Sequence, residues 1–261
     1  MQNNYRLLTL YSGSKGNSVF FSAGGTSILI DAGKSATALA SALREIGSSV
    51  DKISAVFVTH EHCDHISALD VLSKRSSIPI HIMELSATSF DRRPDSYAHN
   101  VMIRHKELFC ETVGSLTVKA FRTPHDSRMS VGYRIEFDDG DRRRSIGIAT
   151  DIGHISPEVR DGLSGCETVV LESNHDVTML MEGRYPHDLK KRILSPRGHL
   201  SNTDSAAFAL DLARGGTKSF LLAHLSEENN RPEIAFDEVS SALSDMDVKI
   251  AVASPDVPTE I

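Results

Sequence analysis

Four side chains of the kinds that bind metal ions fall within six consecutive positions: His60, His62, Asp64 and His65. They follow an apolar run, 53–58, that is typical of a buried strand, and they precede a helical pattern. A strand that ends in a turn directs His60 and His62 to one position and brings Asp64 and His65 round to a second one. Imidazole nitrogens suit zinc, while carboxylate oxygens also accept harder metals. The spacing therefore predicts two adjacent ions on one loop, rather than a polar loop that carries histidines by chance.

Three more potential ligands each lie just past the end of a predicted strand, where α/β sheets usually place their sites. These residues, with the strand before each, are His125 (115–121), Asp151 (145–149) and His224 (219–223). The set predicts a dinuclear site in which the ligands of one ion are His60, His62 and His125, those of the other are Asp64, His65 and His224, and the bridge is Asp151. Two divalent ions about 3.5 to 4 Å apart hold a hydroxide and stabilise charge on an attacked phosphoryl or carbonyl centre. The predicted chemistry is hydrolysis, and it requires Asp64.

Two features near these ligands leave alternatives open. Asp31 ends the predicted strand 26–30, where its carboxylate either orients a metal-binding histidine through the second ring nitrogen or caps the following helix. The loop 13–17 either presents backbone N–H groups to an anion or forms a hairpin turn; it lacks the full P-loop spacing.

The composition is that of an ordinary globular protein. The chain has 261 residues, 40% of them hydrophobic and 24% charged, and its length predicts a single domain, 1–261. No apolar run reaches the roughly 20 residues of a membrane-spanning helix. The N-terminal residues lack a signal-peptide pattern, and the three cysteines fit reduced thiols, so we expect a cytoplasmic protein without membrane association. The net charge of −7 argues against binding nucleic acid through the overall field, but two divalent ions would add about four positive charges at the site itself.

Short strands alternate with helices in both halves of the chain. The predicted strands are 6–10, 18–22, 26–30, 53–58, 78–83, 115–121, 131–137, 145–149, 168–171, 219–223 and 248–253. The predicted helices are 37–46, 66–74, 157–163, 188–194, 206–213 and 233–243, and 90–106 is expected to be irregular. The simplest packing places two sheets face to face with helices outside, which brings the strand-end ligands to one edge.

The metal motif 59–65, with His125, Asp151, His224 and the segment 31–33, resembles the metallo-β-lactamase fold superfamily. The resemblance extends over nearly the whole chain. It implies an α/β fold of the αββα type, with two mixed β-sheets flanked by helices and a dinuclear site at the sheet edge. The segments 12–18 and 171–176 are similar to signatures of the bacterial YycJ (WalJ) subgroup. That likeness implies a phosphodiesterase, and 5′-to-3′ exonuclease activity on DNA is ascribed to members of the subgroup.

A further likeness, to the tRNA 3′-processing endonucleases, implies a proton donor for the leaving oxygen. By that likeness His199 is the general acid and Glu172 orients it; the alternative for His199 is support of the cap of the next helix. The signature 171–176 implies that Ser173, Asn174 and His175 bind the substrate. For His175, packing beside the metal loop is the alternative.

Together these features predict a dinuclear metal-dependent hydrolase of phosphodiester bonds, namely a 5′-to-3′ DNA exonuclease with a metal-bridging hydroxide. The ions are zinc or manganese, with iron as a third candidate. The segment between Asp151 and His224 is too short for the large domain inserted in RNA-processing nucleases of the superfamily, and DNA is favoured over RNA as the substrate. The alternatives are a thiolester hydrolase of the glyoxalase II type, a phosphodiesterase of small cyclic molecules and a scaffold with a vestigial site. The sequence does not determine the oligomeric state.

Overall fold

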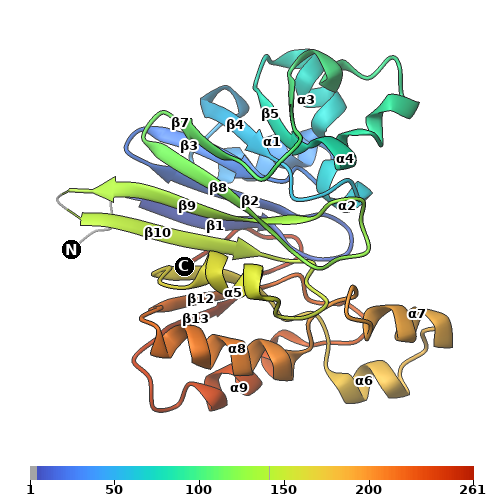
Figure 1. Ribbon diagram of the computed structural model, residues 1–261, viewed down its shortest axis with the longest axis vertical. Helices are drawn as coiled ribbons and strands as arrows, with labels where there is room; N and C mark the ends of the chain where they lie inside the picture. The colour runs from blue at the N-terminus through green and yellow to red at the C-terminus, as the bar shows by residue number, and fades with distance from the viewer. Residues whose placement is uncertain (1–4, 141) are drawn as a thin grey trace.

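Two β-sheets lie face to face at the centre of the protein, and helices cover their outer faces (Figure 1). The computed structural model describes residues 5–140 and 142–261. Within these ranges each sheet has seven strands, and both sheets mix parallel with antiparallel pairs. The predicted αββα sandwich is confirmed.

The first sheet is built from the N-terminal half of the chain and a short strand near its end. Its strands, in spatial order, are β14 (Thr259–Glu260), β1 (Tyr5–Tyr11), β2 (Ser18–Ala23), β3 (Thr26–Ile30), β4 (Ile53–Phe57), β5 (Ile80–Met83) and β6 (Met102–His105). The helical segments of this half are α1 (Ala36–Glu45), η1 (Val50–Lys52), α2 (Cys63–Ile66), α3 (Leu69–Arg75), α4 (Glu84–Ala87), η2 (Phe90–Arg92) and η3 (Tyr97–Asn100), where η marks a 3₁₀-helix. The apolar faces of α1 and α3 pack on the outer face of this sheet.

The second sheet comes from the C-terminal half. Its strands, in spatial order, are β13 (Lys249–Val252), β12 (Ser219–Ala223), β11 (Thr168–Glu172), β10 (Arg142–Ala149), β9 (Val131–Asp139), β8 (Leu116–Arg122) and β7 (Cys110–Val113). The helices of this half are α5 (Pro157–Leu163), α6 (Val177–Glu182), α7 (His187–Ile193), α8 (Asn202–Arg214) and α9 (Pro232–Ala242). α5, α8 and α9 pack on the outer face, whereas α6 and α7 project from the body at the same end as α2 (Figure 1).

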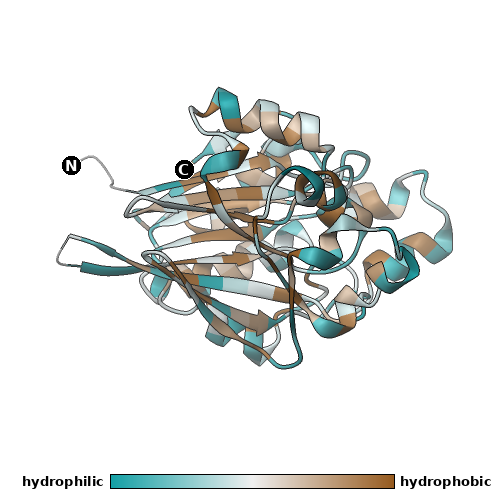
Figure 2. Ribbon diagram, turned by 90° about the horizontal axis from the view of Figure 1, so that it is seen from above, coloured by the Kyte–Doolittle hydropathy of each residue, from teal (hydrophilic) through white to brown (hydrophobic). Residues whose placement is uncertain are grey.

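Burial on both faces of the central strands produces three apolar layers. Phe20 on β2 packs under α1 and α3, while its neighbour Phe21 points between the sheets because successive strand residues face opposite sides. Phe21 and Phe137 of the other sheet are 5.0 Å apart between ring centroids. Hydrophobic residues accordingly concentrate along the central strands (Figure 2). The packed sheets fix the positions of the strand ends.

The chain departs from the predicted elements at a few places. The single helix predicted over 66–74 is wrong: α2 ends at Ile66 and α3 begins at Leu69, and between them the Ala68 N–H donates to the Ala32 carbonyl at 2.9 Å. The stretch 90–106, expected to be irregular, contains β6, η2 and η3, and the elements η1, α4, β7, α6 and β14 were not predicted. Within the described ranges, none of the helices has the length and apolarity needed to cross a bilayer.

Candidate metal centre

The first group of potential ligands joins the loop after β4 to the loop after β8. His60 Nε2 lies 2.9 Å from His62 Nδ1, and His62 Nδ1 lies 3.3 Å from His125 Nε2. One nitrogen from each ring lies within 4.8 Å of the others, a separation at which one ion can contact all three. The structure thus brings together the three histidines that the sequence assigned to the first ion.

The second group lies beside the first and includes the end of β12. Asp64 Oδ2 is 3.4 Å from His65 Nε2 and 3.8 Å from His224 Nε2. These three side chains also meet the spacing for one ion. Asp64 and His65 lie in the first turn of α2, so the turn after His62 carries the chain from one group to the other.

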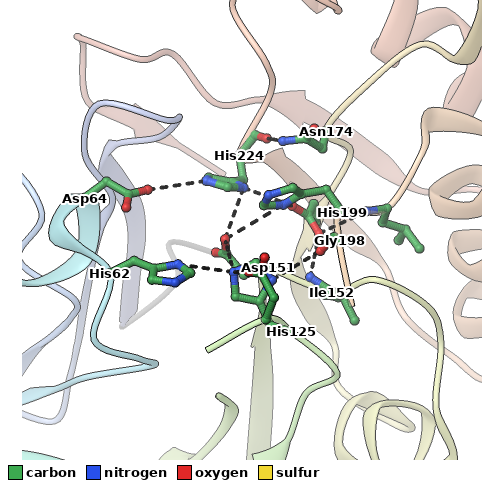
Figure 3. Close-up of polar contacts among 12 residues, drawn as sticks. His62, Asp64, His125, Asp151, Ile152, Asn174, Gly198, His199 and His224 are labelled. Atoms are coloured by element: carbon green, nitrogen blue, oxygen red, sulfur yellow. Dashed lines mark hydrogen bonds and ion pairs between the residues drawn. The ribbon is translucent and has the colours of Figure 1, made fainter. Parts of the chain in front are cut away.

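Asp151 lies between the two groups (Figure 3). Its Oδ2 is 3.4 Å from His65 Nε2, and its Oδ1 is 3.6 Å from His125 Nε2. Both Asp151 Oδ2 and His224 Nε2 are buried without a hydrogen-bond partner. Buried polar atoms normally have partners, so two orphaned donor atoms that face one centre fit the binding of a metal ion.

The second ring nitrogens of these histidines are held by acceptors. His65 Nδ1 donates to Asp31 Oδ2 at 2.7 Å, and His125 Nδ1 donates to the Gly198 carbonyl at 3.2 Å. Such acceptors fix the tautomer, which leaves each Nε2 unprotonated toward the centre. The alternative for Asp31, a cap of the next helix, is wrong because Ser35 caps α1 through the Ala38 N–H.

Three residues of the centre adopt backbone angles that are uncommon outside glycine. Asp31, Asp151 and His224 have φ of 63°, 58° and 57°. Asp31 and His224 come directly after β3 and β12, and Asp151 lies two residues past the end of β10. The left-handed turn redirects the chain at the strand end, and such conformations cluster at functional sites.

The charges around the centre favour a bound cation. Burial alone would lower the pKa of His224, but the carboxylates of Asp151, Asp64 and Glu172 raise this pKa to about 10. On the opposite side, burial and the neighbouring histidines lower the pKa of His60 well below its ordinary value, so that ring is neutral as a metal ligand must be. Carboxylates and neutral imidazoles are the donors that divalent transition metals prefer.

Glu172 at the end of β11 holds two histidines at once. Its Oε1 accepts from His199 Nδ1 at 2.8 Å and from His224 Nδ1 at 2.9 Å. Its Oε2 accepts from the backbone N–H of Ile152 at 2.7 Å. Burial alone would raise the pKa of this carboxyl, but His199 and His224 hold it well below its usual range. The His199 ring lies at the mouth of the centre with 21% of its side chain exposed, and the cap of α8 is the Ser201 hydroxyl.

A cavity of about 260 Å³ opens over the centre. Its floor includes His62, Asp64, Asp151 and His224, and His199 forms part of its wall. The outer wall comes from the segment of α6 and α7, through Tyr185, Leu189, Arg192 and Ile193. A substrate that reached the floor would therefore pass under this projecting segment.

The three residues of the segment 173–175 differ in their access to this cavity. Asn174 lines it, and its amide donates to the His224 carbonyl at 2.8 Å. Ser173 is fully buried and donates to Asn202 Oδ1 at 2.7 Å. His175 is 1% exposed, is not among the lining residues, and neither of its ring nitrogens makes a hydrogen bond.

Two supporting residues were not identified by sequence reasoning. The Asn17 amide donates to Asp64 Oδ2 at 3.2 Å, and the Ser12 hydroxyl accepts from the His224 N–H at 2.7 Å. The loop 13–17 is a turn that joins the antiparallel strands β1 and β2, as one of the two alternatives required. Asn17 in this loop and the adjacent Ser12 thus hold proposed ligands from both halves of the chain. The segment 12–18 was noticed in the sequence as a motif, but the motif does not indicate which residues Ser12 and Asn17 contact.

Comparisons with known proteins identify the family to which this chain belongs. The family model described as "Beta-lactamase superfamily domain" matches residues 26–225. The chain is 32% identical to exodeoxyribonuclease YycJ of Bacillus anthracis, over 97% of this chain and 96% of that protein. It is also 32% identical to exodeoxyribonuclease WalJ of Streptococcus pneumoniae, over 98% and 97% of the two chains.

A solved structure shares the fold. The crystal structure of YhfI from Bacillus subtilis, a metallo-β-lactamase fold protein, superposes with a TM-score of 0.72 at 17% identity and covers 100% of both chains. The histidine and aspartate clusters imply divalent metal ions in this chain. The chain is therefore a metal-dependent hydrolase of the beta-lactamase superfamily and belongs to the same family as YycJ and WalJ.

Proposed function

We propose that this hydrolase is a dinuclear phosphodiesterase that degrades DNA as a 5′-to-3′ exonuclease. The observation that carries the proposal is the meeting of two donor groups, the Asp151 carboxylate between them and the Glu172–His199 pair in one cavity. The names of the relatives YycJ and WalJ support DNA as the substrate. We propose the cytoplasm as the place of action.

The proposed ligands are those that the spacing predicted. They are His60, His62 and His125 for one ion, Asp64, His65 and His224 for the other, and Asp151 between them. Two divalent ions, zinc or manganese with iron as a third candidate, would activate a water molecule and polarise the phosphoryl oxygens. Asp31 and Glu172 orient His65 and His224 through their second ring nitrogens.

His199 is proposed as the proton donor to the leaving oxygen. Glu172 accepts from Nδ1, which leaves Nε2 as the ring atom that can donate into the cavity. Asn174 is the residue of the 173–175 segment that we propose to contact the substrate directly, because its side chain lines the cavity. For the buried Ser173 and His175, a role in substrate binding would act through the backbone that they position.

The first test of the reaction uses end-labelled single-stranded and double-stranded DNA and RNA, with added manganese or zinc. Successive release of nucleotides from the 5′ end of DNA is the expected result. A thiolester and a small cyclic phosphodiester, assayed beside them, represent the two alternative hydrolases. Turnover of one of these without any release of nucleotides would replace the nuclease proposal.

The second test separates metal binding from proton donation. Asp64→Asn is expected to lose bound metal and activity together. His199→Gln is expected to retain the metal while kcat falls by about 10² to 10⁴, the usual contribution of a general acid. His187→Gln on the exposed α7 is the matched control. Full activity of Asp64→Asn would contradict the mechanism.

A further inference from the structure

A second cavity lies next to the metal centre and shares one wall with it. Its volume is about 350 Å³, and it is lined by Arg122, Arg128 and Arg197, which we call the arginine cavity. His125 lines both this cavity and the one over the centre. The other lining residues are Thr123, Pro124, Ser127, Met129 and Ser130, none of which carries a negative charge.

The three guanidinium groups keep their charge unpaired. The side chain of Arg122 is exposed and makes no hydrogen bond or ion pair with any residue of the described ranges, although its charge acts on the exposed Glu158. The guanidinium of Arg128 donates through Nη1 to the Thr88 hydroxyl at 2.8 Å, a neutral partner. The Glu61 carboxylate accepts from the backbone N–H of Arg128 at 2.8 Å, and the charge of Arg128 acts on the exposed Asp91, but neither carboxylate forms an ion pair with the guanidinium. By contrast, Arg192 at the outer wall of the first cavity is neutralised in an ion pair with Asp126. The positive charge next to the centre is thus concentrated in the arginine cavity.

Backbone contacts fix the arginine cavity relative to the metal centre. Arg197 Nε donates to the carbonyl of His125 at 2.9 Å, and its Nη2 donates to the carbonyl of Ser127 at 3.1 Å. These contacts hold the guanidinium against the loop that carries a metal ligand. An anion bound by Arg197 would therefore lie at a set position from a group bound at the centre.

We propose that the arginine cavity binds a second phosphate of the substrate strand, beside the phosphodiester at the metal centre. The inference rests on the proposed nuclease function. A contact with a second phosphate would favour a polymer over a small phosphodiester as the substrate. A guanidinium recognises phosphate through two parallel hydrogen bonds, and such backbone contacts set the register of a nucleic acid without reading its bases. The overall charge of −7 makes a local group of unpaired arginines a specific feature rather than a general field.

The test is a cycle that combines an arginine variant with a neutral linkage in the DNA. Binding of the metal-loaded protein to a fluorescent single-stranded oligonucleotide is measured by anisotropy, with phosphorothioates at the cleavable linkages to slow turnover. Methylphosphonates then replace the linkages one at a time, which removes a single negative charge. We expect one linkage at which the methylphosphonate weakens binding to the wild type by about tenfold.

Arg122→Ala and Arg128→Ala are each expected to weaken binding of the unmodified strand by about tenfold. In these variants the methylphosphonate at the sensitive linkage should cause a smaller loss than in the wild type, because one of the guanidinium groups that contact this phosphate is already absent. The slope of log affinity against log salt should fall by about 0.7 per variant. Arg214→Ala, an exposed arginine at the far end of α8, is the control and should behave as the wild type. Melting temperature and metal content verify that each variant is folded.

The outcomes separate this inference from the proposed function. Additive losses in the cycle, or variants that bind as the wild type does, would overturn the arginine cavity even if DNA is cleaved. Coupled losses without any cleavage would support the arginine cavity and contradict the nuclease. A wild type that neither binds nor cleaves the strand would contradict both.

Discussion

Glu172 connects the two tasks of the centre, because one oxygen accepts from a proposed ligand, His224, and from the proposed acid, His199. Glu172→Gln removes the charge but keeps the shape of the side chain. We expect metal affinity to fall by about 10- to 100-fold, as for other residues that orient ligands, and kcat to fall in addition. Metal titration and steady-state kinetics at saturating metal measure the two effects separately.

Asp31→Asn is the comparison for that variant, since Asp31 contacts His65 but not His199. It is expected to weaken metal binding while kcat at saturating metal stays close to that of the wild type. If Glu172→Gln and Asp31→Asn behaved alike at saturating metal, Glu172 would have no role in proton donation.

Gly33, in the loop after β3, allows this loop to lie close to the metal motif 59–65. A Cβ atom there would lie 1.5 Å from the Asp64 carbonyl oxygen, a backbone atom that cannot rotate away. Gly33→Ala is therefore expected to displace Asp64 and to reduce both bound metal and melting temperature. Gly215→Ala, whose Cβ would lie 3.2 Å from its nearest neighbour, is the control. Unchanged metal content in Gly33→Ala would show that the contact is not needed.

At the residue scale, the sequence located the proposed ligands because each combines a metal-binding side chain with the end of a recognisable strand. His125, Asp151 and His224 were found in this way. Asn17 was not, because its contact with Asp64 spans 47 positions of the chain. Residue type and local pattern do not carry information about such a contact.

At the element scale, most of the predicted strands that were confirmed are largely buried; the exception is β13, an edge strand that its apolar residues still marked. β6 and β7 are also edge strands and were missed because exposed and polar residues interrupt their apolar pattern, as Glu111 and Thr112 do in β7. α6 has six residues, too few for a helical period to show, although Asp176 provides a cap by accepting from the Met179 N–H. The break after α2 follows from the bond of Ala68 to Ala32, which a helical pattern does not indicate.

The second sheet predicts a pH-dependent stability through Glu136 on β9. Burial alone would raise the pKa of this carboxyl, but cations on the same face lower it to about 2. The cations that donate to it are Lys119, Arg134 and Arg143. A carboxyl with a depressed pKa stabilises the fold above its unfolded-state pKa of 4.5, and this contribution is lost as the pH falls from there toward 2.

Glu136→Gln should therefore lower the free energy of unfolding at pH 7 by roughly 1 to 2 kcal/mol after allowance for solvent screening. The difference from the wild type should shrink as the pH is lowered from about 4.5 to 3. Urea unfolding over this range measures it, with Glu182→Gln on the exposed end of α6 as the control. A difference that is constant with pH would exclude the ion pairs as its cause.

At the scale of the whole molecule, Tyr133 joins the sheets directly behind the metal loop. It is fully buried, and its hydroxyl on β9 donates to the Val58 carbonyl at 2.6 Å, one residue before Thr59. Tyr133→Phe leaves that carbonyl without its partner, so we expect a loss of about 1 to 3 kcal/mol. Thermal unfolding followed by circular dichroism measures the loss of stability. The metal content of the variant tests whether the substitution also disturbs the metal loop.

Because the site and the central core draw on both halves, we propose that the two halves unfold as one domain. Tyr133→Phe should then shift a single transition, whichever half a probe reports on. Tyr5→Phe is a suitable control, since Tyr5 also packs between the sheets through its ring, at 5.0 Å from Phe137. Two separated transitions would contradict the single domain.

At the left-handed turns of Asp31, Asp151 and His224, backbone strain favours a residue other than the one that the proposed chemistry requires. Each turn holds a side-chain-bearing residue where glycine would rest without strain, at a cost of order 1 kcal/mol. At Asp31 the hydrogen bonds from the Thr59 N–H and hydroxyl, both at 2.7 Å, outweigh this strain. A library randomised at Asp151 and His224 and ranked by melting temperature without added metal should enrich glycine and asparagine. Selection for thermal stability alone would therefore replace proposed metal ligands, and the stabilised variants would be inactive.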